Sequence, residues 1–312
     1  MTPDQIKQSA AELKASTSRP FGINLFAPLA SPPTPADSEV ALDYLRPIHE
    51  RLGLPAPRLP DPPAADFWDK LEACLESGAR VFSFTFGIPP VDVIASIKDA
   101  GMRFFGTATT VEEAKLLADA GAEGVVVQGS EAGAHRGTFA TDFESGMVGT
   151  IALVPQVVDA VSLPVSASGG IMDGRGIAAA LALGAQAVQL GTAFLTTTET
   201  AIPAAYKQAI PMSSADQTKV TRAFSGRPAR GIVNEFMEAL DRRQQDILPY
   251  PYQNSLTRPM RTEAARRGER DFLSLWAGQG AALARTGSAS TLVADLVTET
   301  RAAIARLSTL VD

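Results

Sequence analysis

The chain has 312 residues, of which 45% are hydrophobic and 20% charged, and its formal net charge at pH 7 is −6. These values are ordinary for a globular protein of one large or two smaller domains. The acidic balance argues against a nucleic-acid-binding surface, because such surfaces are basic. A local group of arginines, Arg261, Arg266, Arg267 and Arg270, is instead predicted to form the solvated face of a helix.

Cysteine content and hydropathy exclude further classes. Cys74 is the single cysteine, so the chain has no intramolecular disulfide and no zinc site built on cysteines, and the pattern around it predicts a small buried residue. No apolar run approaches the roughly 20 residues of a membrane span. The polar first residues do not resemble a signal peptide. We therefore expect a cytoplasmic protein with neither a membrane nor nucleic acid as a partner.

Six short apolar runs alternate with helical patterns. The runs span residues 21–26, 81–86, 102–108, 122–129, 163–170 and 185–192. The helical patterns end at glycines where a C′ glycine is expected, namely Gly78, Gly101, Gly121 and Gly184. This alternation predicts an α/β fold of parallel strands joined by right-handed crossovers. The continuous apolar runs are typical of strands covered on both faces, so either a doubly wound sheet or a (β/α)8 barrel short of two strands fits.

The alternation stops near residue 200. We predict a barrel over residues 1–200, a helical insertion over the substrate face at 201–284, and a C-terminal helix at 285–312 that returns to the barrel. Within the insertion, residues 218–240 and 256–268 are predicted as helical. The proline-rich stretches 27–36 and 54–64 are predicted as a long loop and an ordered helix connection.

Two glycine-containing turns, Gly169-Gly170 and Gly191-Thr192, each follow a predicted strand. In a parallel barrel both turns open on the same face, and the turns after the last strands, with a helix N-terminus nearby, often bind phosphate. Glycine lets the backbone approach an anion closely, and the Thr192 hydroxyl can donate a hydrogen bond. We predict a phosphate site here; the alternative is that the glycines serve turn geometry and packing alone.

His135 is the candidate catalytic residue. It lies in a loop of small residues after the run 122–129, and we expect this loop to adapt its shape to a ligand. Histidine titrates near neutrality and suits proton abstraction; the alternative is a histidine that binds a nearby carbonyl. His49, in a helical pattern, is predicted to have a surface or core role. No metal site is predicted, because no second histidine or cysteine lies near His135.

A serine nucleophile is not favoured. Ser130 and Ser168 are predicted on the same face as His135. Neither lies in the GxSxG pattern that marks a nucleophile elbow.

Four motifs together resemble the FMN-dependent nitronate monooxygenases, also called 2-nitropropane dioxygenases. They are QGSEAGAHRGTF, SASGGIMDGRGIAAALALGAQAVQLGTAFL, FSGRPARGIVNEF and LWAGQGA, and the resemblance extends from FGINLF onward. It implies a TIM (β/α)8-type barrel with the FMN phosphate at the two glycine turns and His135 as the active-site base. By resemblance, the flavin contacts fall on Asn24, Gln128, Gly133, Gly169, Gly170, Gln189, Leu190, Gly191 and Thr192.

The chain departs from this family in two places. The family usually has glycine where this chain has Ala134, and the added methyl narrows the loop if this position needs a positive φ. By the same resemblance, the first two strands of the family are absent, since residues 1–14 resemble the helix that follows the second strand. We therefore expect a barrel of about six strands.

The resemblance implies oxidation of alkyl nitronates, and of nitroalkanes, with O₂ to carbonyl compounds and nitrite. His135 would take the α-proton of a neutral nitroalkane, a step that a nitronate does not need. Two alternatives stay open. One is a flavin-dependent enoyl-thioester or quinone reductase using NAD(P)H on the same scaffold, although the chain shows no second GxGxxG at a strand–helix junction. The other is an incomplete barrel that binds no flavin.

Overall fold

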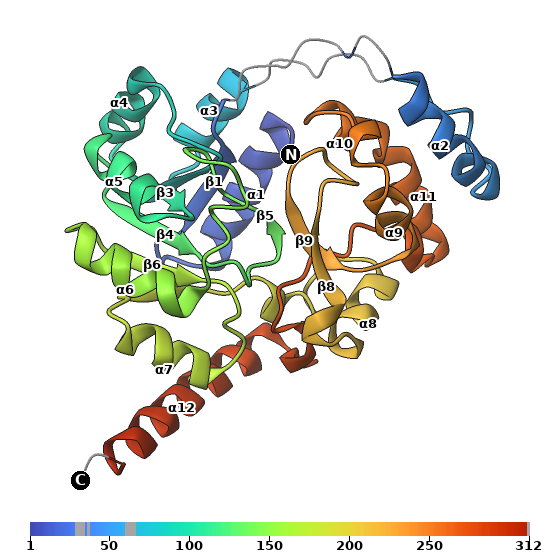
Figure 1. Cartoon of the computed structure of the whole chain (residues 1–312). Coiled ribbons are helices and arrows are strands. Elements are labelled where there is room, and N and C mark those ends of the chain that lie inside the picture. The colour runs from blue at the N-terminus through green and yellow to red at the C-terminus, as the bar shows by residue number, and fades with distance from the viewer. Residues whose placement is uncertain (29–34, 36–37, 60–66, 311–312) are drawn as a thin grey trace.

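Six parallel strands form one curved sheet in the computed structural model, which describes residues 1–28, 35, 38–59 and 67–310 (Figure 1). The strands are β1 (Gly22–Phe26), β2 (Val81–Thr85), β3 (Arg103–Ala108), β4 (Gly124–Gln128), β6 (Val165–Ser168) and β7 (Ala187–Gln189). Their order in the sheet is β1-β2-β3-β4-β6-β7. The predicted six-stranded barrel-type fold is confirmed, with β1 and β7 at the two edges of a curled half-barrel. The proline-rich stretches lie mostly outside the described residues.

Helices cover the outer face of this sheet (Figure 1). They are α1 (Pro3–Ser16), α3 (Phe67–Leu75), α4 (Val91–Asp99), α5 (Val111–Asp119), α6 (Thr150–Ala160) and α7 (Gly174–Ala182). The four glycines predicted to follow helix ends have φ between 72° and 95°. In this left-handed region glycine has no Cβ to clash, so each glycine stops its helix and turns the chain into the next strand.

The strands alternate between an apolar outer row and a more polar inner row. Phe82, Phe84 and Phe104 point outward and are fully buried in the core between sheet and helices. The opposite positions include Asn24, Ser83, Thr85, Thr107, Gln128, Ser168 and Gln189. The expectation that both faces are apolar is therefore wrong for the inner face. The period of two places these polar groups inside the half-barrel, near the carboxyl ends of the strands.

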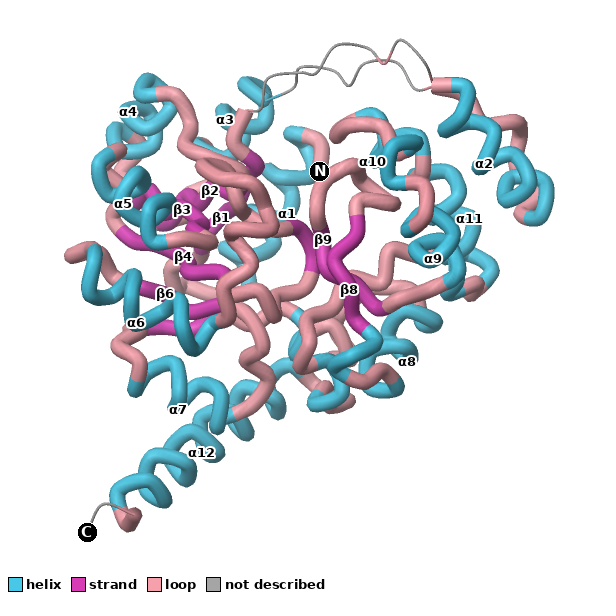
Figure 2. Tube along the Cα trace, in the orientation of Figure 1, coloured by secondary structure: helices cyan, strands magenta, loops and turns pink. Residues whose placement is uncertain are grey.

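A second, antiparallel sheet corrects the predicted helix at residues 218–240. β8 (Thr218–Thr221) and β9 (Ala229–Ile232) form a hairpin, and β5 (Ala134–His135) pairs with the free side of β9. Figure 2 shows this hairpin in magenta between the barrel sheet and the remaining helices. The chain turns at Gly226, whose φ is 82°, and Pro228 follows; both residues oppose a continuous helix. A helix, α9 (Glu235–Asp241), begins only after the Asn234 side chain accepts a hydrogen bond from the Met237 N–H.

The segment after β7 is otherwise mostly helical, as predicted, and has its own hydrophobic core. Its helices are α8 (Ala204–Met212), α9, α10 (Tyr252–Leu256) and α11 (Arg258–Arg267), with short 3-10 turns η1 (Thr192–Phe194), η2 (Ala215–Gln217), η3 (Gln244–Asp246), η4 (Arg270–Phe272) and η5 (Ala281–Leu283). α2 (Glu39–Arg51) joins this core through Leu42 and Leu45. An early helix of the chain therefore packs on the insertion instead of on the barrel.

Three residues considered from sequence have structural roles. Cys74 is fully buried in the barrel core, as predicted, and burial raises the pKa of its thiol to about 11. His49 is buried as well, with Nδ1 2.7 Å from the Pro55 carbonyl. The prediction of a solvated arginine face is wrong for Arg261, whose guanidinium donates to the Asn254 carbonyl and side-chain oxygens at 2.7 and 2.9 Å.

The last helix, α12 (Ala289–Ser308), packs along α7 at the start of that helix. The Gly174 N–H donates to the Glu299 carboxylate at 3.1 Å, and Arg285 pairs with the same carboxylate. A Cβ added at Gly174 would lie 2.3 Å from the Thr300 nitrogen, so only glycine allows this approach. Across the described residues, no helix has both the length and the apolar character that crossing a membrane requires.

We predict that Gly174→Ala lowers the free energy of unfolding by about 1–3 kcal/mol, because the methyl would force two backbones apart. Gly176→Ala, in the same helix, is the matched control. An added Cβ there lies no closer than 3.4 Å to a neighbour, so helix propensity should stabilise that variant by up to about 1 kcal/mol. Urea unfolding of both variants measures this. Equal effects of the two substitutions would contradict the close-contact explanation.

Candidate active site

The carboxyl ends of β4, β6 and β7 bring the predicted site residues to one rim. Gln128, Ser168 and Gln189 stand in register across these three strands. The loops that leave them carry His135, the Gly169-Gly170 turn and the Gly191-Thr192 turn, respectively. This is the end of a parallel barrel at which ligands bind.

The two glycine turns differ in backbone conformation and in the space around them. Gly169 and Gly170 have φ of 118° and 71°, so glycine is needed there for backbone conformation. Gly191 has φ −112°, and a Cβ added to it would meet no protein atom within 4 Å. Among the described residues, no acceptor is found for the backbone N–H of Gly191 or Thr192. The second turn therefore offers open space lined by free donors, which suits an anion.

The helix N-termini near these turns are occupied by protein carboxylates. Glu131 accepts from the Thr150 N–H at 3.0 Å at the start of α6. Asp173 accepts from the Arg175 and Gly176 N–H groups at 3.0 and 3.2 Å at the start of α7. The N-termini of α6 and α7 are therefore occupied, and the free donors are those of the Gly191-Thr192 turn, where η1 begins.

One segment of the insertion ties two of these loops together, the one after β4 and the one after β7. The Gly278 N–H donates to Thr192 Oγ1 at 3.0 Å, and the Gln279 N–H donates to the Glu131 carbonyl at 2.9 Å. A Cβ at Gly133 would lie 2.5 Å from the Gly278 nitrogen, so Gly133 must be glycine for this packing. The sequence motif LWAGQGA supplied only a resemblance; its structural role comes from contacts that span the chain.

His135 is held rigidly, so the expectation of an adaptable loop is wrong. It pairs with Ala229 in the antiparallel sheet, and its Nε2 lies 2.8 Å from Ser225 Oγ. The Gln128 side-chain amide holds the backbone that follows this residue, donating to the His135 carbonyl at 3.0 Å and accepting from the Gly137 N–H at 2.9 Å. The preceding residue, Ala134, has φ 62°, so the position where the resembled family has glycine does adopt a left-handed conformation.

Two buried arginines fix the loop that carries His135. Arg136 donates to the carbonyls of Gln128, Gly129 and Gly146 at 2.6 to 3.1 Å. Arg230, on β9, donates to the Ser130 carbonyl at 3.0 Å. Sequence analysis missed both, because a buried arginine on carbonyl groups has no local signature.

Aromatic rings surround the His135 imidazole. The ring centroids of Phe26, Phe86 and Trp276 lie 6.2, 5.7 and 5.6 Å from it. Phe86 has φ 78°, an unusual conformation for a bulky residue, and the Arg227 guanidinium stacks 3.9 Å above its ring centroid. These three aromatic residues and Arg227 were not predicted from the sequence.

Comparison with known proteins decides the family. The family model described as nitronate monooxygenase matches residues 1–299. The chain belongs to the nitronate monooxygenase family. The resemblance seen in the motifs is thereby confirmed, as is the prediction that the chain is an oxidoreductase, and the family implies a flavin cofactor.

Relatives within the family match over most of their length. The probable nitronate monooxygenase of Staphylococcus haemolyticus is 42% identical over 302 residues, which are 96% of this chain and 85% of that protein. The probable nitronate monooxygenase of Bacillus subtilis is 43% identical over 280 residues, covering 90% and 80%.

Solved structures share the fold. A nitroalkane oxidase from Streptomyces ansochromogenes has a TM-score of 0.89 at 39% identity, covering 98% of this chain and 87% of that one. FabK from Thermotoga maritima has a TM-score of 0.75 at 28% identity, covering 99% and 85%.

The flavin contacts expected for the family do not all lie together. Gln128, Gly133, the two glycine turns and Gln189 lie at the rim, whereas Asn24 lies on edge strand β1, where its side chain donates to the Ser83 carbonyl and hydroxyl at 3.1 and 2.9 Å. The Leu190 side chain packs into the core.

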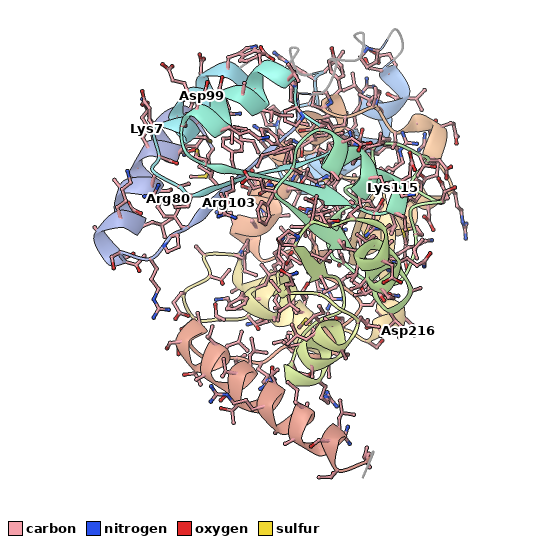
Figure 3. All side chains as sticks on the ribbon, turned by 90° about the vertical axis from the view of Figure 1, so that its left-hand side faces the viewer. Lys7, Arg80, Asp99, Arg103, Lys115 and Asp216 are labelled. Carbon is pink, nitrogen blue, oxygen red and sulfur yellow. The ribbon has the colours of Figure 1, made fainter. Side chains whose placement is uncertain are left out.

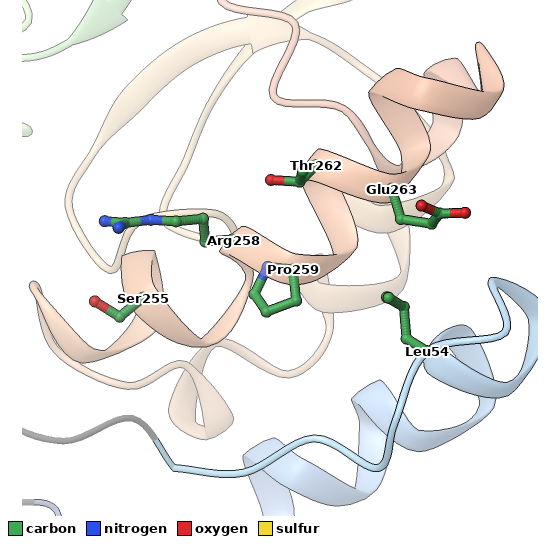
Figure 4. A pocket seen from close by; sticks show the side chains of 6 residues that line it. All are labelled: Leu54, Ser255, Arg258, Pro259, Thr262 and Glu263. Atoms are coloured by element: carbon green, nitrogen blue, oxygen red, sulfur yellow. The ribbon is translucent and has the colours of Figure 1, made fainter.

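Three cavities in the described part of the chain have none of the predicted site residues in their lining. One of about 560 Å³ lies on the outer side of α10 and α11, beside the chain that follows α2 (Figure 4). Another, of about 830 Å³, lies at the amino ends of β2 and β3, where Arg80 and Arg103 are neighbours (Figure 3). A smaller cavity of about 290 Å³, lined partly by Arg136, Arg222 and Arg227, lies beside the His135 loop.

Burial and neighbouring cations keep His135 neutral. Burial, followed by the charges of Arg227 and Arg261, lowers the pKa of His135 from 6.5 to about 4. The imidazole is therefore uncharged at neutral pH and carries a free lone pair. The same two guanidinium groups favour an anion in this part of the site.

This pKa shift predicts a pH-dependent stability. Between pH 4 and 6.5 the unfolded state binds more protons at His135 than the folded state, so the free energy of unfolding falls as the pH is lowered through this window. A shift of this size corresponds to about 3 kcal/mol. Urea unfolding of the flavin-free protein at several pH values, compared with His135→Asn, measures it. The variant should lose less stability than the wild type between pH 7 and 4, and parallel curves would contradict the assignment.

Proposed function

We propose that the chain binds FMN at the rim of the half-barrel and oxidises alkyl nitronates with O₂ to carbonyl compounds and nitrite. The observation that carries this proposal is the position of the open Gly191-Thr192 turn. It lies on the same rim as His135, and Gly278 ties it to the loop that carries His135. A phosphate site and a neutral base are thereby held together by direct contacts.

The residues present fit a flavin mononucleotide. The N–H groups of Gly191 and Thr192 would hold the phosphate, and the Thr192 hydroxyl, which accepts from Gly278, still has its proton to donate. Gly170 and Gln189 adjoin this turn on the rim. The polar inner row, including Asn24 and Gln128, would face the rest of the cofactor. FMN, when bound, accepts the electrons of the substrate.

The charge around His135 favours a nitronate over a neutral substrate. Arg227 and Arg261 lower the pKa of His135, and the same positive field stabilises an anion. A nitronate is an anion and needs no proton abstraction. His135 would take the α-proton only when the substrate arrives as a neutral nitroalkane.

The insertion would complete the substrate side of the site. We propose that residues 1–200 and 285–312 carry the flavin and that residues 201–284 cover the substrate. In support, the insertion contributes Ser225, Arg227 and Trp276 around His135. The Tyr206 hydroxyl donates to the Trp276 carbonyl, which helps to position that ring.

Gly191→Val tests the phosphate site. The side chain would occupy the space that the anion needs, and its Cβ would meet no described residue within 4 Å apart from the chain neighbours, so we expect a folded protein. Two lost charge-assisted hydrogen bonds should weaken FMN binding at least about tenfold. Flavin fluorescence titration measures the affinity, and circular dichroism checks the fold. Gly22→Ala is the control and should bind FMN normally, because Gly22 lies at the amino end of β1 and a Cβ there comes no closer than 3.5 Å to a neighbour. Unchanged FMN affinity of Gly191→Val would remove the phosphate assignment.

His135→Asn tests the base. We expect turnover of neutral nitroalkanes to fall about 10²–10⁴-fold, with a much smaller loss on preformed nitronates. Steady-state oxygen consumption on both substrate forms gives the comparison. Equal losses would mean that His135 binds or orients the substrate without taking a proton. NAD(P)H oxidation driven by a quinone or an enoyl thioester, without nitronate oxidation, would instead support the reductase alternative.

A further inference from the structure

Ser225 is a buried serine whose hydroxyl meets three polar groups. Its Oγ lies 2.8 Å from His135 Nε2, 3.2 Å from the Arg227 backbone nitrogen and 3.1 Å from the Arg227 carbonyl oxygen. Ser225 is 2% exposed. The hydroxyl therefore has to satisfy these groups without help from bulk solvent.

A hydroxyl donates one hydrogen bond and accepts two. The Arg227 N–H can only donate to Oγ, and the Arg227 carbonyl can only accept from it. Within the described residues, that carbonyl has no other protein donor, so the Ser225 hydroxyl is its hydrogen-bond donor. The remaining position on Oγ is an acceptor, so the His135 nitrogen that faces it must carry the proton.

The other imidazole nitrogen is then the free one. With the proton on Nε2, a neutral His135 has its lone pair on Nδ1. Nδ1 makes no hydrogen bond to any residue that the structure describes. The ring is surrounded by Phe26, Phe86 and Trp276. None of these side chains carries a hydrogen-bond acceptor that would favour the tautomer with the proton on Nδ1.

We propose that Ser225 is a positioning residue that fixes the tautomer of His135, so that Nδ1 is the atom that takes a substrate proton. The catalytic part of this inference rests on the proposed function. The Cα–H bond of a neutral nitroalkane breaks, its electron pair stays on the substrate to give the nitronate, and the proton bonds to Nδ1. The resulting imidazolium keeps its Nε2–H hydrogen bond to Ser225 Oγ, and the Ser225 hydroxyl keeps its own proton, which it continues to donate to the Arg227 carbonyl. No oxidant takes part in this step.

The second histidine provides an internal reference. His49 Nδ1 lies 2.7 Å from the Pro55 carbonyl, which can only accept, so Nδ1 carries the proton. His49 Nε2 is buried without a partner. The chain has two histidines, and the structure assigns them opposite tautomers.

The test is long-range ¹H–¹⁵N correlation NMR on the full chain labelled at its histidine nitrogens, near pH 7, with and without added FMN. His135→Asn assigns the two rings. We expect His135 to be protonated at Nε2, with a slowly exchanging proton, and His49 at Nδ1. A His135 ring protonated at Nδ1 would overturn the proposal without any variant of Ser225 being needed.

Variants of Ser225 test its role. Ser225→Ala should speed exchange of the Nε2 proton and shift the His135 nitrogens toward a mixture of tautomers, and Ser225→Thr, which keeps the hydroxyl, should restore the wild-type pattern. Ser213→Ala is the matched control, because Ser213 is also buried and donates to a carbonyl, that of Ile210, away from His135. An unchanged His135 spectrum in Ser225→Ala would overturn the proposal.

Kinetics separates this inference from the proposed function. Ser225→Ala should lower kcat on neutral nitroalkanes about 10- to 100-fold, alter the pH profile and leave KM and nitronate turnover close to wild type. Equal losses on nitroalkanes and nitronates would count against a positioning role. If the tautomers are as stated but the protein oxidises no nitronate, the proposed function fails and the role of Ser225 in orienting His135 stands. If nitronates are oxidised but the tautomer is reversed, only the positioning fails.

Discussion

The buried guanidinium of Arg136 is the interaction on which the rest of the site depends. The loop after β4 turns sharply over the barrel rim, and its carbonyl groups would be buried without donors. Arg136 supplies donors to Gln128, Gly129 and Gly146, and Arg230 supplies one to Ser130 from the hairpin of the insertion. Because a guanidinium presents several donors in a fixed plane, these contacts set the direction of the adjacent His135. The barrel and the segment after β7 are thus joined beside His135, the proposed base.

The barrel could be predicted from sequence because its signals are local. Continuous apolar runs and C′ glycines such as Gly78 and Gly101 mark where strands begin and helices end, and the structure has these elements. The β8–β9 hairpin was missed although Gly226 and Pro228 interrupt the helical pattern; the pairing of β9 with β5, more than 80 residues earlier in the chain, has no local signal at all. The polar inner row was missed because single polar residues, such as Ser83, were read as part of an apolar run.

The site residues also divide into those that have a local sequence signal and those that have none. His135 and the glycine turns stand out locally, since a histidine among small residues and paired glycines are unusual patterns. Ser225 and Trp276 reach His135 from residues 90 or more positions away, and nothing in their immediate sequence distinguishes them from core residues. Ala134 lies between these cases: the family resemblance raised the question of its conformation, and its φ of 62° answers it. An L-residue in this region costs roughly 1–2 kcal/mol, which persists because the contacts of Arg136 and Gly133 on either side leave the backbone no alternative.

Under the proposed function, the charges around His135 favour one form of substrate over the other. A proton moved to His135 creates a buried cation beside Arg227 and Arg261; burial, followed by the charges of these two arginines, already holds the pKa of that imidazole near 4. The electrostatic cost of this imidazolium is reduced only if the negatively charged nitronate formed in the same step stays close to it. A substrate that arrives as a nitronate meets the two guanidinium groups as an anion and leaves His135 neutral. The positive charges therefore stabilise the nitronate in both cases. With a neutral nitroalkane, however, the same charges also disfavour the protonated His135 that must form first. The arrangement of Arg227, Arg261 and His135 is thus better matched to binding a preformed nitronate than to generating one.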